Sequence, residues 1–346
     1  MKGLSRRDWL KSASLTSGLA LLGGNGIISS LSAEEIRKFN PRPLAGPIRL
    51  GSNENPYGPS ESMRKAMVAA FENSCRYPWT YNASLVKMIA EKEGVPENYI
   101  VPVAGSTEGL KVAGITFGQG GEIITCAPTF LSMMEYAELW GTEINWVSLT
   151  KDLDFDLDEI EKRVSAETKL VFLCNPNNPT GKLLPAQRVL DFCETVSKKT
   201  VVFSDEAYYD YITEPNYPSM VELVKKGQNV VVSRTLSKVY GLAGIRLGYL
   251  IAKPDLATKL RDRVVANTNI MAIEAGKAAL LDKEFYQFSL KKNEEAKSLL
   301  IQTLNELKLP YLESHANFVF FQSGKDITQL GKTMAEKGFI IGRPFP

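Results

Sequence analysis

Residues 229–246 read Asn-Val-Val-Val-Ser-Arg-Thr-Leu-Ser-Lys-Val-Tyr-Gly-Leu-Ala-Gly-Ile-Arg. The valine run at 230–232 is typical of a buried strand, and Lys238 follows it, with glycines between Lys238 and Arg246. A lysine at the end of such a strand is placed to form a Schiff base with an aldehyde cofactor. The alternative is a polar turn beyond a strand, and this segment alone does not separate the two interpretations.

Short runs rich in β-branched residues recur on both sides of this stretch, and segments with helical periodicity separate them. The candidate strands are 99–103, 122–126, 143–149, 169–174, 200–204, 229–233 and 246–251. The candidate helices between them are 108–117, 130–140, 157–164 and 185–196. The alternation predicts an α/β fold with a mostly parallel seven-stranded sheet in an α/β/α large domain. Ligands bind outside the carboxyl ends of the strands in such sheets.

The pattern changes towards the end of the chain. Residues 254–308 are helical and charged, and strand-like 317–321, a helix at 326–337 and strand-like 339–341 follow. We therefore expect a smaller α+β domain at 261–346 after a large domain at 61–260, with a Pro- and Gly-rich arm at 34–60.

Composition excludes several classes of partner. The 346 residues include 41 basic and 39 acidic side chains, so no net field selects nucleic acid, and small molecules are the expected partners. The four cysteines form no C-x-x-C pair, and His315 is the only histidine. We therefore expect no metal site and no disulfide framework.

Residues 5–11, Ser-Arg-Arg-Asp-Trp-Leu-Lys, are followed by an uncharged, weakly apolar stretch to Ala33. This resembles a twin-arginine export signal at 1–33, with Trp9 in the place of the usual Phe. Cleavage after Ser32 fits the small-x-small rule better than cleavage after Ala33, and both stay open. A membrane anchor is the alternative, although glycines and serines make a poor bilayer span. The resemblance predicts twin-arginine translocation and a periplasmic location.

Four further strand ends carry distinctive loops, each with an ordinary alternative. Ser106 and Thr107 open a helix after 99–103, where free amides form a phosphate cradle or the hydroxyls simply cap the helix. Asn178 lies in the proline-rich 175–181, able to bond a phenolate or to form a plain turn. Asp205 ends an apolar strand, where it meets a cation such as a pyridinium or caps a turn. Phe130 lies flat on an aromatic ring or belongs to the core.

The order of these loops is informative. A phosphate cradle, an aromatic residue, Asn-Pro-Asn-Asn-Pro-Thr-Gly (175–181), Asp-Glu-Ala-Tyr (205–208) and Thr-Leu-Ser-Lys (235–238) follow successive strands. Together they resemble fold-type I pyridoxal phosphate-dependent aminotransferases of class I/II. The segments 50–59, 76–78 and 314–320 are similar to the histidinol-phosphate aminotransferase branch, and the resemblance runs from residue 48 to the end of the chain.

The resemblance implies a pyridoxal 5′-phosphate site and a role for each matching residue. Lys238 forms the Schiff base and removes the Cα proton of the substrate. Asp205 pairs with the ring nitrogen of the cofactor. Asn178 and Tyr208 hydrogen-bond to the ring oxygen. Phe130 stacks on the ring. The groups expected around the phosphate are Ser106, Thr107, Thr235, Ser237 and Arg246, together with Tyr77 from the second subunit of a homodimer.

The expected reaction moves an amino group between an L-amino acid, or an amino phosphate such as histidinol phosphate, and a 2-oxo acid. Asn53, Tyr57 and Arg343 are expected on the substrate side. The family pattern continues beyond Pro346 with an arginine that grips the substrate carboxylate, so we expect an incomplete C-terminus. Two alternatives stay open: a pyridoxal phosphate-dependent decarboxylase of the same branch, and an exported binding protein without catalytic activity.

Overall fold

The computed structural model describes residues 46–342. The expected export signal, most of the expected arm and Arg343 lie outside these residues. The described residues belong to one compact unit, and the predicted domain boundary at residue 260 stays a prediction. None of the helices in the described part of the chain combines the length and apolar character that a membrane crossing requires.

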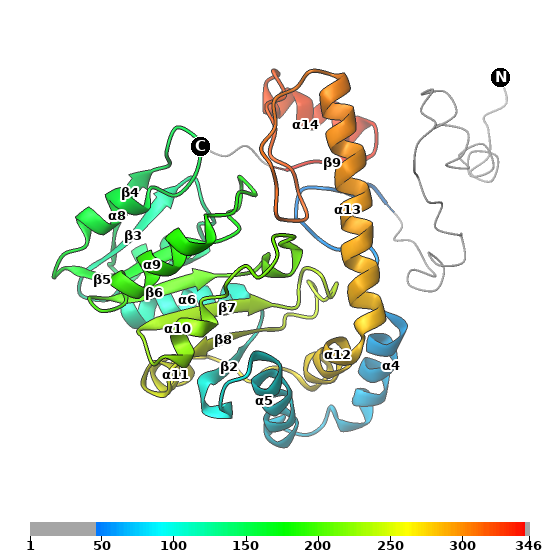
Figure 1. Ribbon diagram of the computed structural model, residues 1–346. Helices are drawn as coiled ribbons and strands as arrows, with labels where there is room; N and C mark the ends of the chain where they lie inside the picture. The colour runs from blue at the N-terminus through cyan, green and yellow to red at the C-terminus, as the bar shows by residue number, and fades with distance from the viewer. Residues whose placement is uncertain (1–45, 343–346) are drawn as a thin grey trace. The chain divides into compact units, whose positions relative to one another are not determined.

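A seven-stranded sheet lies at the centre of the fold (Figure 1), in the order β2-β8-β7-β6-β5-β3-β4. Its strands are β2 (Ile100–Val103), β3 (Glu122–Ala127), β4 (Glu143–Ser148), β5 (Thr168–Cys174), β6 (Val201–Asp205), β7 (Val230–Thr235) and β8 (Gly248–Ala252). β8 runs antiparallel to both of its neighbours, and every other pair is parallel. The predicted mostly parallel α/β sheet is therefore confirmed, with all seven strands close to their expected positions.

Helices cover both faces of this sheet, which explains why β7 and β8 are buried along their whole length. In Figure 1, α9 and α10 lie in front of the sheet and α6 lies behind it. The helices up to this point are α4 (Glu61–Ala70), α5 (Trp79–Glu93), α6 (Ser106–Phe117), α7 (Ser132–Glu138), α8 (Leu157–Arg163), α9 (Ala186–Val196), α10 (Val221–Lys225) and α11 (Pro254–Arg261).

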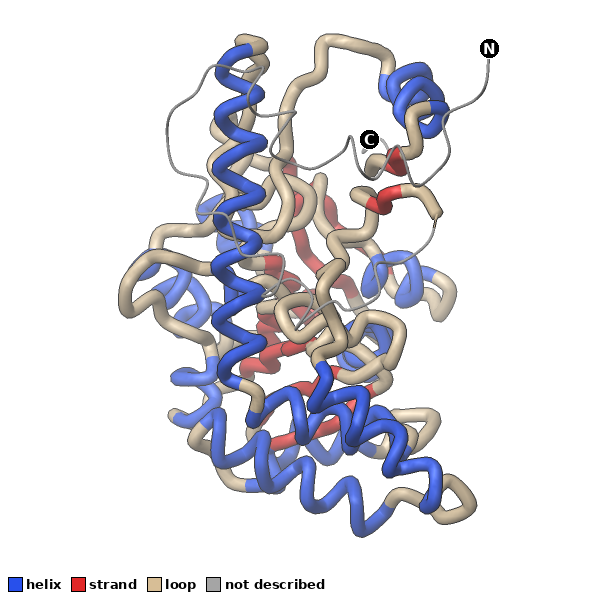
Figure 2. The backbone as a smooth tube through the Cα atoms, turned by 90° about the vertical axis from the view of Figure 1, so that its right-hand side faces the viewer, coloured by secondary structure: helices blue, strands red, loops and turns tan. Residues whose placement is uncertain are grey.

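Two consecutive helices lead from the sheet to the last part of the chain. α12 (Ile270–Leu281) packs against α4 and α5, and the long α13 (Lys283–Glu306) rises from its end (Figures 1 and 2). Asn269 and Asp282 cap the two helices by accepting hydrogen bonds from main-chain amides in the first turns. α14 (Ile327–Glu336) and β9 (Phe339–Ile340) then complete the chain as described.

The first and last described segments are joined in a second, two-stranded sheet. β1 (Ile48–Arg49) pairs in parallel with β9. The chain then crosses to the loop after β7, which carries Lys238. There Gly58 and Gly241 touch so closely that a Cβ added to either would lie 2.5 Å from the other's Cα. The chain between these anchors, residues 50–57, is called the strap below.

One expected strand was wrong, and another was placed with too early a start. In the described part of the chain, residues 317–321 form only an isolated bridge, between Tyr311 and Phe321, because the pairing with residues 310–312 does not extend further. Arg246 lies before β8, not in it, and its φ of 63° is left-handed, which a strand does not allow.

Candidate active site

The Lys238 side chain points from the loop after β7 towards the strap. Its Nζ donates to the main-chain oxygens of Ser52 (3.3 Å) and Asn53 (3.1 Å) and lies 5.3 Å from the centre of the Tyr208 ring. Burial lowers the pKa of the amine to about 8, against the opposing attraction of Asp205 and Glu54. A substantial neutral fraction is thus available near neutral pH, as a reacting amine requires.

Asp205 ends β6, beside β7, and its carboxylate is buried. Its Oδ1 has no hydrogen-bond partner within residues 46–342. Burial raises the pKa of this carboxyl to about 7, although the Lys238 ammonium opposes the rise. A buried carboxylate oxygen with no partner is costly, so the position suits a ligand that brings a cationic N–H.

The Tyr208 hydroxyl is the meeting point of two amides. Asn53 Nδ2 donates to it at 3.1 Å and Asn178 Nδ2 at 3.5 Å. The ring packs edge-on against Phe318, with centroids 5.2 Å apart. The strap, the loop after β5 and the loop after β6 therefore converge on one phenol beside Lys238.

The start of α6 forms a second polar cluster. Its N-cap is Gly105, and no side chain among the described residues caps the first turn, so the helix-cap alternative for Ser106 and Thr107 does not apply. Arg246 lies against this turn: a Cβ added to Gly105 would be 2.2 Å from Arg246 Nη2. An uncapped helix N-terminus beside a guanidinium is a favourable anion site.

The loops after β3 and β5 are tied together beside these groups. Thr129 Oγ1 donates to Asn177 Oδ1 (2.9 Å), and Asn177 Nδ2 donates to the Pro128 main-chain oxygen (3.2 Å). These bonds fix the turn that precedes Phe130, which is half-buried. The expected stacking of Phe130 on a ligand ring stays a prediction.

The remaining expected residues have varied surroundings. Thr235, the last residue of β7, and Ser237, in the loop after it, are both buried, and Ser237 N donates to Thr235 Oγ1 at 3.1 Å. Tyr57 packs edge-on against Phe288 of α13, with centroids 5.1 Å apart. Tyr77 is 74% exposed and stacks on Trp79, so it lies on the surface of the single chain and not among its own site residues.

Sequence reasoning missed the part played by residues 317 and 318. Asn317 Nδ2 donates to the Asn53 main-chain oxygen at 3.0 Å, the same oxygen that accepts from Lys238. Asn53 has a φ of 53°, a left-handed conformation that asparagine tolerates better than most residues. The run Asn-Phe-Val-Phe was predicted to be a strand and is part of the family resemblance of 314–320, but no site role was assigned to its residues.

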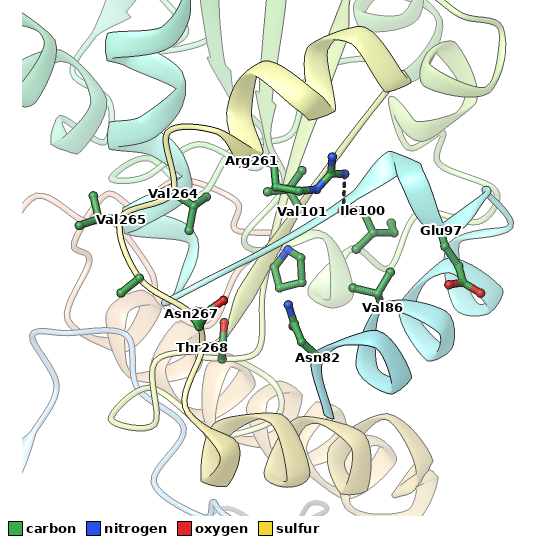
Figure 3. Close-up of a pocket in the computed structure, with 12 residues that line it drawn as sticks. Asn82, Val86, Glu97, Ile100, Val101, Arg261, Val264, Val265, Asn267 and Thr268 are labelled. Atoms are coloured by element: carbon green, nitrogen blue, oxygen red, sulfur yellow. Dashed lines mark hydrogen bonds between the residues drawn. The ribbon is translucent and has the colours of Figure 1, made fainter. Parts of the chain in front are cut away.

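A separate hollow lies at the β2 edge of the sheet (Figure 3). It has a volume of about 300 Å³, and Asn82, Pro102 and Thr268 are among the residues that line it. Two of the lining residues are hydrogen-bonded to each other: Arg261 Nη2 donates to the main-chain oxygen of Ile100 at 3.4 Å. None of the expected site residues lines this hollow, and it adjoins the beginning of β2, whereas the site lies at the strands' carboxyl ends.

Comparison with known proteins gives a consistent result. The family model of aminotransferase class I and II matches residues 45–345. The histidinol-phosphate aminotransferase of Caldicellulosiruptor saccharolyticus is 34% identical over 296 residues, which are 85% of this chain and 82% of that protein. Histidinol-phosphate aminotransferase 1 of Bacillus cereus is 35% identical, over 85% of this chain and 80% of the relative.

A solved structure agrees with the sequence relatives. The histidinol-phosphate aminotransferase of Sinorhizobium meliloti, in complex with pyridoxal-5′-phosphate, superposes with a TM-score of 0.78. It is 26% identical, and the match covers 93% of this chain and 87% of that one.

The unpartnered Asp205 predicts a stability effect in the ligand-free protein. Because its pKa is raised from 3.8 to about 7, ionisation destabilises the fold progressively from pH 4 to 7, and the full cost is present above pH 7. Asp205→Asn should therefore raise the free energy of unfolding at pH 8 by at most about 4 kcal/mol, and by less at pH 5, and Tm should rise accordingly. Thermal unfolding at the two pH values measures this difference.

Asp191→Asn, on the exposed face of α9, is the matched control and should change Tm little at either pH. An Asp205→Asn protein that is no more stable than wild type at pH 8, or equally stabilised at both pH values, would contradict the interpretation.

Proposed function

The chain belongs to the class I and II aminotransferases, and from this premise we propose that it transfers amino groups at a site built around Lys238, with pyridoxal 5′-phosphate as its cofactor. The observation that carries the proposal is the convergence of three groups. These are a lysine with a lowered pKa, a buried carboxylate oxygen without a partner, and an uncapped helix terminus beside Arg246. Each group meets a different part of one cofactor.

The described residues fit this cofactor. Asp205 would accept from its ring nitrogen, and Tyr208 and Asn178 would hold its ring oxygen. Ser106, Thr107, Thr235, Ser237 and Arg246 would bind its phosphate, since hydroxyls, helix amides and a guanidinium suit that anion. Asn53 and Tyr57 are proposed to line the substrate side together with Arg343.

When bound, the cofactor supplies an electron sink for the negative charge that develops at the substrate Cα. Lys238 Nζ, in its neutral form, would accept the proton from the substrate Cα and would then donate it to the former aldehyde carbon of the cofactor. Asp205 keeps a proton on the ring nitrogen by remaining ionised, and the strap oxygens of Ser52 and Asn53 orient the lysine amine.

For the substrates, we propose an L-amino acid, or an amino phosphate such as histidinol phosphate, as donor and a 2-oxo acid as acceptor. The support is that the curated relatives named above are histidinol-phosphate aminotransferases. The comparisons favour neither the decarboxylase nor the non-catalytic alternative. Exchanged amine without released carbon dioxide is the product pattern that amino transfer requires.

The lysine assignment predicts a pH dependence. Only the neutral amine reacts, so the rate at which Lys238 captures pyridoxal phosphate should rise with pH, with a midpoint near 8. Borohydride trapping followed by peptide mass spectrometry measures the capture. Lys238→Ala should abolish both trapping and turnover, while Lys226→Ala, at an exposed lysine, should affect neither. A Lys238→Ala protein that keeps both activities would disprove the assignment.

We propose that the protein acts as a homodimer in which Tyr77 reaches the site of the other subunit. Tyr77 and Trp79 form an exposed stacked pair, 74% and 68% accessible, as expected for side chains that a second copy covers. Co-expressed Lys238→Ala and Tyr77→Ala chains should then regain activity, to about a quarter of wild type, because mixed dimers contain one intact site. Activity no higher than that of either variant alone would place Tyr77 outside the partner's site.

We also propose export by the twin-arginine pathway, supported by Ser5-Arg-Arg-Asp-Trp-Leu-Lys11 and the uncharged stretch after it. Replacing Arg6 and Arg7 with lysine in the full chain should keep the protein in the cytoplasm, since the pathway reads the arginine pair. Fractionation of cells expressing each form measures the distribution. Equal periplasmic amounts of the two forms, or none of the wild type, would argue against export.

A further inference from the structure

Glu206 is a second buried carboxylate next to Asp205, and it points to a different set of groups. Its Oε2 accepts from Arg234 Nη2 and from Ser219 Oγ, both at 2.8 Å. Its Oε1 accepts from the main-chain amide of Met220 at 2.8 Å. Two adjacent carboxylates, 2% and 3% exposed, therefore share the end of β6.

Arg234 supplies the positive charge in this cluster. It lies in β7, directly before Thr235, and is 6% exposed. Its guanidinium carbon is 3.9 Å from the centre of the Tyr209 ring, and Nη2 also donates to Ser219 Oγ at 3.1 Å. The ion pair thus links the loop that carries Asp205 and Tyr208 to the strand that leads to Lys238.

The titratable groups around the two carboxylates differ. Those that interact with Asp205 belong to Glu206, Lys238, Cys174 and Tyr208. Those that interact with Glu206 belong to Arg234, Glu93, Cys193, Tyr209 and Tyr217. Arg234 is thus the one cation in direct contact with Glu206 in the described part of the chain, and without it two negative charges would adjoin each other in the interior.

We propose that Arg234 is a positioning residue for Asp205: by pairing with Glu206 it neutralises the adjacent negative charge and so keeps Asp205 ionised for the cofactor's ring nitrogen. The inference rests on the proposed function. Buried ion pairs are often no more stabilising than apolar residues of similar size. Stability alone therefore does not explain the pair of Arg234 with Glu206, and the inference gives this pair a role at the site.

The test is the affinity of the ligand-free protein for pyridoxal phosphate, measured by quenching of tryptophan fluorescence. Arg234→Met leaves Glu206 unpaired, and the affinity should fall about tenfold or more at pH 8.5. The loss should become smaller as the pH is lowered, because burial raises the pKa of Glu206 and so favours its uncharged form. Replacing both partners, as Glu206→Gln with Arg234→Met, should restore affinity to within about threefold of wild type.

One further variant separates charge from packing, and another is a surface control. Arg234→Lys keeps the positive charge and loses the planar contact with Tyr209, so its affinity should stay close to that of wild type. Arg163→Met breaks the surface pair with Glu159 and should leave the affinity unchanged. If Arg234→Met does not fold, the two charge-balanced variants, Arg234→Lys and the double variant, still decide the question by their own affinities.

A folded double variant that binds the cofactor as weakly as Arg234→Met would overturn the inference and show that only packing matters. So would an Arg234→Met protein with wild-type affinity, or charge-balanced variants that fold and lose affinity about tenfold. Wild-type protein that does not bind pyridoxal phosphate would overturn the proposed function as well, which distinguishes the two failures.

Discussion

The fold holds a carboxylate, Asp205, at the buried end of a central strand, with one oxygen that has no partner among residues 46–342. Burial makes this arrangement unfavourable for the protein alone, and a cationic N–H from a ligand relieves it. The parallel register of β5, β6 and β7 places the loops that carry Asn178, Asp205 and Lys238 at one edge of the sheet. The site therefore depends on the sheet for its geometry, and on the proposed function the cofactor would satisfy its buried charge.

The strap closes the site from the other side. It begins at β1, which pairs with β9, and ends at the contact between Gly58 and Gly241. Between these anchors the main-chain oxygen of Asn53 accepts from both Lys238 and Asn317, and its side chain donates to Tyr208. One residue in a left-handed conformation thus connects the lysine, the phenol and the last part of the chain.

Local sequence patterns were sufficient to locate the seven strands and the polar loops that follow them. β-Branched runs report burial between two helical layers, and Asp205, Asn178 and Lys238 are recognisable by their place just after such runs. Contacts between distant segments leave no such pattern. The meeting of Gly58 with Gly241, and the role of Phe318 against Tyr208, depend on tertiary packing. For the same reason 317–321 resembled a strand, although among residues 46–342 only an isolated bridge, between Phe321 and Tyr311, pairs it with another segment.

The most direct measurement is a crystal structure of the full chain with pyridoxal phosphate. The account predicts the ring nitrogen within hydrogen-bond distance of Asp205 Oδ1, and the phosphate against the amides of Ser106 and Thr107 and the guanidinium of Arg246. A cofactor whose phosphate lies elsewhere, or whose ring nitrogen faces a group other than Asp205, would contradict it.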